Sequence, residues 1–95
     1  MEAFNRQTLQ QLTGEAVTLR DSAGTEVQLT IHKVEAGVLD GEQWESFSLL
    51  LHGTPDFHVP QGSYHLQHER FGEQFLFLSP GSPVEYEIVV NTRKS

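Results

Sequence analysis

The stretch VPQGSYHLQHERFGEQFLFLSP, residues 59–80, predicts a β-hairpin around which the rest of the chain is organised. Polarity alternates along residues 63–69, as it does in a strand that turns one face toward a core. One face carries Tyr64, Leu66 and His68, and the other carries His65, Gln67 and Glu69. We expect the first of these faces to point inward and His65 to point outward.

The second strand of the hairpin is predicted at residues 74–79. It is apolar on both faces, with Phe75 and Phe77 on one and Leu76 and Leu78 on the other. Such a strand is typical of a central position or of one covered on both sides. We therefore expect this strand to be covered on both sides or to lie centrally.

Turn-forming residues delimit this hairpin. Residues 70–73 predict the reversal, because Gly72 can adopt a positive φ without steric cost. Pro60 and Gly62 shape the entry to the first strand, and the sequence PGSP at residues 80–83 ends the second. In this interpretation Pro60, Gly62, Tyr64, His68 and Gly72 have structural roles.

Four further strands are predicted from the same alternation, at residues 16–20, 26–38, 46–52 and 84–91. The pattern slips near Lys33, Val34 and Glu35, which indicates a bulge or bend. Residues 37–45 are a polar connection that contains Trp44, and residues 53–60 are irregular.

The N-terminal segment predicts one short helix at residues 5–12. Asn5 or Thr8 can cap its start, and Gly14 is suited to end it. Phe4, Leu9 and Leu12 fall at helical spacing, and a helix of about two turns must pack to be stable. We expect these three apolar side chains to close one end of a β core.

These elements predict an all-β fold of about six mostly antiparallel strands, forming a small sandwich or barrel with one short N-terminal helix. Parallel βαβ units need crossover helices, which the pattern lacks. Residues 1–95 contain no repeat or linker, so we expect a single β domain.

Composition excludes several classes of function. The formal net charge is −7, which argues against binding to nucleic acid or to an anionic membrane and suits solubility or a basic partner. The chain has no cysteine, so disulfides and thiolate chemistry are excluded. No signal peptide is visible, and we expect a cytoplasmic protein, with export by a signal-less assembly left open.

Five histidines are the residues most suggestive of chemistry: His32, His52, His58, His65 and His68. Histidine-rich strands can bind zinc, copper or nickel. However, residues three apart in a strand face opposite sides, so His65 and His68 do not converge. The sequence has no recognisable catalytic nucleophile, phosphate loop or calcium loop. We therefore expect no cofactor and no enzyme activity.

Two aromatic residues, Trp44 and Phe57, lie in polar or irregular segments and are the candidate partner-binding residues. Each could instead fold over a sheet edge and belong to the core. Trp44 is surrounded in sequence by Asp40, Glu42 and Glu45. An exposed indole ringed by acids would suit a partner with a basic rim and an apolar socket.

The chain resembles a family of small bacterial domains of unknown function. The resemblance extends over residues 4–14, 47–51, 60–68, 72, 77–80 and 86–89, and its most specific part is the pattern P-Q-G-x-Y-x-L-x-H, from Pro60 to His68. Relatives often accompany phage-tail-collar-like proteins, which implies a place in a tail-like assembly. The resemblance supplies no catalytic residue.

Two hypotheses follow from these observations. In the first, the chain is a non-enzymatic accessory or structural module that binds another protein, and an exposed edge strand such as residues 84–91 accepts a partner strand. In the alternative, it is a small β-barrel that binds a small ligand or a metal through histidines.

Overall fold

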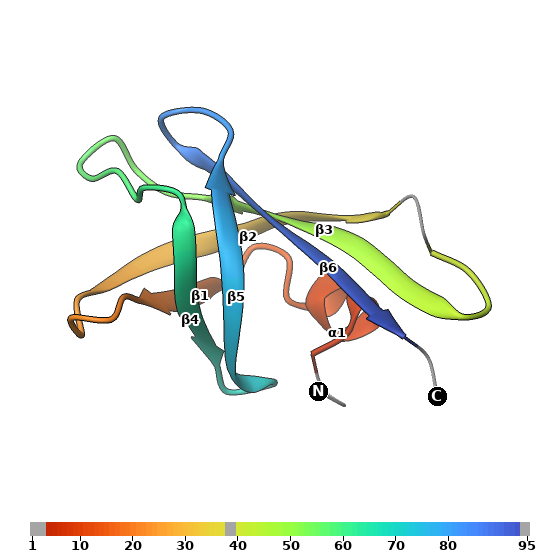
Figure 1. The fold of residues 1–95 in the computed structure, drawn as a ribbon. Helices are drawn as coiled ribbons and strands as arrows, with labels where there is room; N and C mark the ends of the chain where they lie inside the picture. The colour runs from red at the N-terminus through yellow and green to blue at the C-terminus, as the bar shows by residue number, and fades with distance from the viewer. Residues whose placement is uncertain (1–3, 38–39, 94–95) are drawn as a thin grey trace.

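A computed structural model describes residues 4–37 and 40–93, and for residues 92 and 93 it describes the backbone alone. The described residues form a closed, six-stranded antiparallel barrel with one short helix, as Figure 1 shows. The elements are α1 (Arg6–Gln11), β1 (Ala16–Arg20), β2 (Glu26–Ala36), β3 (Trp44–His52), β4 (Gly62–His68), β5 (Gly72–Pro80) and β6 (Glu85–Arg93). The predicted all-β class is confirmed, and the barrel is the form it takes.

Strand order around the barrel is β1-β2-β3-β6-β5-β4, and β4 closes the ring by pairing with β1. Inward side chains on alternate positions of every strand make one core, because successive residues of a strand face opposite sides. The core residues on the strands are Val17, Leu19, Leu29, Ile31, Phe47, Leu49, Leu51, Leu66, Leu78, Tyr86, Ile88 and Val90.

The helix α1 forms as its sequence predicts. Asn5 is the N-cap, and its Oδ1 accepts a hydrogen bond of 2.8 Å from the Thr8 N–H. Gly14 adopts φ +92°, and its N–H donates to the Ile31 carbonyl over 2.7 Å, which ties the end of this segment to β2. Leu9 and Leu12 are buried in the core, as expected.

The predicted slip in the second strand is a β-bulge at His32. Ile31 pairs with Leu51 and Lys33 pairs with Leu50, so His32 has no opposite residue. The bulge therefore begins one residue before the position that the pattern indicates. The strand ends at Ala36, and Val38 of the predicted range lies outside the described residues.

The β4–β5 hairpin is confirmed, with seven residue pairs from Gly62↔Leu78 to His68↔Gly72. Its turn differs by one position from the prediction. The connection is residues 69–71, and Gly72 is the first residue of β5, where it adopts φ +76°. Phe71 is buried, although a turn residue is usually exposed, because its ring packs edge-on against Phe4 at 5.0 Å.

Of the two alternatives for β5, cover on both faces is wrong, and the strand instead lies between β4 and β6 in the barrel wall. Phe75 and Phe77 are 64% and 52% exposed, whereas Leu78 on the opposite face is buried. The reason is architectural: a barrel wall has a single interior, and none of residues 4–37 and 40–93 forms a second layer over the outer face of β5.

The junction between β5 and β6 is short. Only Ser79↔Glu87 and Pro80↔Tyr86 are paired there among the described residues, whereas β3 and β6 share nine pairs. Beyond the junction the two strands diverge, and α1 lies between their separated ends in the view of Figure 1. Phe4 fills this part of the core, with its ring 6.1 Å from Phe47.

Within the described residues, no helix is long and apolar enough to cross a membrane.

The conformation of Gly72 leads to a stability prediction. A Cβ added at Gly72 or at Gly41 would meet no atom within 4 Å, but only Gly72 has a positive φ. Gly72→Ala should therefore cost about 1–2 kcal/mol of unfolding free energy through backbone strain alone. This corresponds to a Tm lower by roughly 5–15 °C in a domain of this size. Gly41→Ala is the matched control, and equal Tm values for the two variants would contradict the turn geometry.

Candidate protein-binding surface

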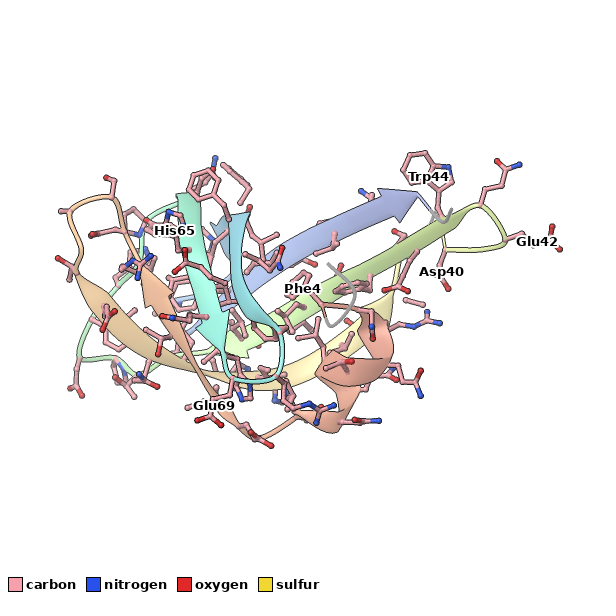
Figure 2. The ribbon with its side chains drawn as sticks, turned by 90° about the horizontal axis from the view of Figure 1, so that it is seen from below. Phe4, Asp40, Glu42, Trp44, His65 and Glu69 are labelled. Carbon is pink, nitrogen blue, oxygen red and sulfur yellow. The ribbon has the colours of Figure 1, made fainter. Side chains whose placement is uncertain are left out.

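Trp44 is exposed at the end of the β3–β6 strand pair. It begins β3 and pairs with Arg93, so it does not belong to the preceding loop as predicted. Its side chain is 37% exposed, and Figure 2 shows it projecting from this end, next to the loop that carries Glu42. Trp44 is therefore not a core residue.

Two of the acids near Trp44 are engaged with the helix. Arg6 Nη1 donates to Asp40 Oδ2 over 2.8 Å, and the Arg6 N–H donates to Glu45 Oε1 over 2.9 Å. Asp40 Oδ1 also accepts from the Ser46 N–H at 3.2 Å. These contacts hold α1 against the start of β3, so Asp40 and Glu45 do not form the free acidic ring that was expected around the indole.

Phe57, the second candidate partner-binding residue, is half-buried and packs against the core. It lies in the irregular segment before β4 and lines a cavity of about 290 Å³ at the mouth of the barrel. Its ring is therefore part of an inner wall, and the structure does not bring Phe57 together with Trp44 on one surface.

Three of the five histidines, His52, His65 and His68, each lie against a single acid, and His58 lies against the ring of Tyr86 at 6.1 Å. His52 Nε2 lies 3.2 Å from Glu85, and its ring stacks on that of His32 with centroids 3.9 Å apart. His65 lies 3.2 Å from Glu73. In the part of the chain that the structure describes, no three histidine, aspartate or glutamate residues are grouped so that they could hold a metal ion.

His68 links the hairpin turn to the start of β1. Its Nδ1 accepts from the Arg70 N–H at 3.0 Å, so Nε2 carries the proton that it shares with Glu15 at 3.1 Å. Its ring stacks on Phe71 and is largely buried, as expected for the inward face. His65 is more exposed and lies against Phe75 on the outer wall, as predicted.

Tyr64 is packed at the entry to the hairpin. Its Oη donates to the Pro60 carbonyl over 2.6 Å, and a side chain at Gly62 would contact its ring. Burial raises the pKa of the Tyr64 hydroxyl, and the nearby negative charge of Asp21 adds to the effect. Pro60, Gly62 and Tyr64 therefore act together as a local structural unit.

An exposed apolar surface, which the sequence pattern did not predict, lies beside the opening between β5 and β6. It consists of Phe75, Phe77 and Val89, the last being 58% exposed. If the pairing continued past Ser79↔Glu87, Phe77 would lie opposite Val89. The signal in the sequence was the apolar run on both faces of β5, which was interpreted as a covered strand.

The backbone beside this surface is also open. On the side of β5 that faces β6, residues 73–78 have no strand partner among the described residues. The corresponding side of β6, at residues 88–93, is likewise unpaired there, since β3 occupies its other side. The site thus combines exposed apolar side chains with unpaired backbone hydrogen-bonding groups.

Fold and surface define a small antiparallel β-barrel that is closed on one side by a helix and a buried phenylalanine. The chain belongs to the family described as "Domain of unknown function (DUF6916)", whose model matches residues 4–90. No curated protein and no solved structure matches this chain. The family therefore confirms the resemblance to a domain of unknown function.

The raised pKa of Tyr64 predicts a pH dependence of stability. The folded protein holds the phenol proton more tightly than the unfolded chain, whose ordinary pKa is 10.0. The stability from this group is therefore complete below that pH and is lost as the pH rises through the folded pKa. In Tyr64→Phe, Tm should fall less steeply than in the wild type from about pH 9 to pH 11. The slopes of Tm against pH are compared, and not the Tm values, because Tyr64→Phe also loses the hydrogen bond to Pro60. Parallel slopes in the two proteins would refute the raised pKa of Tyr64.

The exposure of Trp44 leads to a prediction about the stability of its variants. Trp44→Ala should lower the unfolding free energy by less than about 1 kcal/mol, as surface substitutions do. Phe47→Ala, which empties a buried site on the same strand, should cost about 3–5 kcal/mol. Urea unfolding followed by circular dichroism measures the unfolding free energy of both variants, because Trp44→Ala has lost the tryptophan fluorescence that would otherwise report unfolding. A loss at Trp44 as large as that at Phe47 would show that the indole is part of the core.

Proposed function

We propose that this chain is a non-enzymatic module that binds another protein, and that it does so at the open edge of β5. The supporting observation is the early separation of β5 from β6. On the side of β5 that faces β6, it leaves the backbone of residues 73–78 without a strand partner among the described residues. Unpaired strand edges are templates for a strand from another chain. Main-chain hydrogen bonds then supply affinity, and side chains supply specificity.

The side chains along this edge favour association. Natural proteins usually protect edge strands with lysine, proline or inward charges. Residues 74–78 contain none of these, and Glu73 is engaged with Arg20 at 2.6 Å and with His65 at 3.2 Å. Phe75 and Phe77 offer aromatic area of the kind that dominates interface energetics.

The charge of the chain points to the chemistry of the partner. At a net charge of −7, two copies of the chain repel each other, whereas a basic partner is attracted. We therefore propose that the occupant is an extended segment of a different protein, with apolar side chains facing Phe75 and Phe77 and with lysine or arginine between them.

The remaining polar groups are consistent with a binding role. His52, His65 and His68 each lie against one acid, His32 stacks on His52, and His58 lies tilted against Tyr86. We place the proposed contact in a tail-like assembly, for which the sequence resemblance to domains near phage-tail-collar-like proteins is the sole support. The first encounter would occur in the cytoplasm.

A peptide of alternating lysine and valine tests the edge directly. In NMR hydrogen-exchange experiments, this peptide should slow amide exchange within residues 73–78, because those groups gain hydrogen bonds. A peptide with glutamate in place of lysine should bind more weakly by at least roughly tenfold in Kd. A lysine–proline peptide, which lacks half of the N–H donors, should give no protection.

Paired variants assign the surface. Phe75→Thr/Phe77→Thr keeps β propensity and should weaken peptide binding by about 2 kcal/mol, roughly thirtyfold in Kd. Trp44→Thr removes an exposed aromatic side chain elsewhere and should leave binding unchanged. Loss of binding in Trp44→Thr alone would move the site to the end of the β3–β6 pair. Self-association that the double variant abolishes would make the occupant a second copy.

A further inference from the structure

A cavity of about 290 Å³ opens at the mouth of the barrel, between the β1–β2 turn and the irregular segment before β4. Both segments lie at the end of the molecule away from α1 (Figure 1). The wall is largely apolar and aromatic, and its lining includes Leu19, Val27, Phe57, Val59 and Tyr64, with Thr25, His58 and Pro60 beside them. It is distinct from the proposed protein-binding edge, because Tyr64 packs against the core whereas Phe75 and Phe77 point outward from β5.

One carboxylate lies in this wall. Asp21 Oδ1 accepts hydrogen bonds of 2.9 Å from the N–H groups of Ala23 and Thr25, and these bonds fix the orientation of the carboxylate. The other oxygen, Oδ2, has no hydrogen-bond or ion-pair partner among residues 4–37 and 40–93. Asp21 is half-buried, so its charge is less screened by solvent than that of an exposed acid.

We propose that this cavity binds a small organic cation, namely a primary ammonium or a guanidinium group. The free Oδ2 of Asp21 is the ionic partner, and the rings of Phe57 and Tyr64 are the aromatic surfaces that attract a cation through their quadrupoles. The volume is at the lower end of the range for ligand sites, which limits the ligand to a few heavy atoms.

Two further observations agree with this assignment. The carboxylate of Asp21 adds to the rise in the pKa of Tyr64 that burial begins, so its charge acts on a ring that lines the cavity. The chain as a whole is acidic, so cations are attracted toward it before they reach the cavity. A free amine and the tip of a lysine or arginine side chain from another protein offer the same chemistry.

NMR titration of the 15N-labelled chain with n-butylammonium and with propylguanidinium tests the proposal. Amide signals of Asp21, Thr25, Phe57 and Tyr64 should shift in a saturable manner. Neutral 1-pentanol, which has a similar size, should bind more weakly by at least roughly tenfold in Kd. Equal binding of the alcohol would overturn the proposal, because the cavity would then select for apolar groups alone.

Variants separate charge from folding. Asp21→Asn should weaken cation binding by at least roughly tenfold in Kd and should keep the fold, because its amide oxygen can still accept from Ala23 and Thr25. Asp56→Asn changes an exposed acid of the neighbouring loop and should bind like the wild type. Phe57→Leu preserves an apolar wall but removes an aromatic ring, so it should weaken the binding of the two cations more than the binding of 1-pentanol.

The source of the cation is resolved by comparing n-butylammonium with acetyl-Gly-Lys-Gly-amide. Tighter binding of the peptide would indicate the side chain of another protein, and tighter binding of the free amine would indicate a small metabolite; either result supports the cation site. Wild-type affinity in a folded Asp21→Asn variant would refute it. Because Asp21→Asn leaves β5 unchanged, failure here leaves the proposal for the β5 edge standing.

Discussion

The barrel depends on the burial of Phe4. Among the described residues, only two residue pairs join β5 to β6. Beyond these pairs the core would be exposed to water if Phe4 did not cover it. Phe4 packs against Phe47 and edge-on against Phe71, which joins β3 to the hairpin turn across the gap. The Asn5 cap and the contacts of Arg6 with Asp40 and Glu45 hold it there. Side-chain packing thus replaces hydrogen-bonded closure along this part of the wall.

The same gap connects stability with the proposed function. An edge that is closed by backbone pairing has no groups left for a partner, whereas a gap filled from inside by a phenylalanine leaves them available on the outside. The exposed rings of Phe75 and Phe77 lie beside these groups, and Figure 2 shows Phe4 between the hairpin and the long strands. The mouth of the barrel carries the second feature, a half-enclosed cavity with the fixed carboxylate of Asp21.

Much of the fold could be predicted from local pattern. Alternation identified all six strands and the inward face that contains Leu66. The N-terminal segment predicted a short helix capped by Asn5 or Thr8, and the structure shows that Asn5 is the cap. The candidate site was predicted less well. Trp44 proved to be exposed, as a binding residue needs, but Phe57 packs against the core. The apolar surface formed by Phe75, Phe77 and Val89 was missed, since a run that is apolar on both faces predicts a covered strand.

The sequence by itself determined which residues form strands, where Gly72 reverses the chain and which side chains share a face. These properties depend on neighbours within a few residues, through sterics and the two-residue period of a strand. Tertiary structure alone decided that the sheet closes as a barrel, that β6 leaves β5 after Glu87, and that Asp21 lies in the wall of a cavity. Each of these depends on residues far apart in the chain, such as Phe4 and Phe71, whose contact no local period encodes.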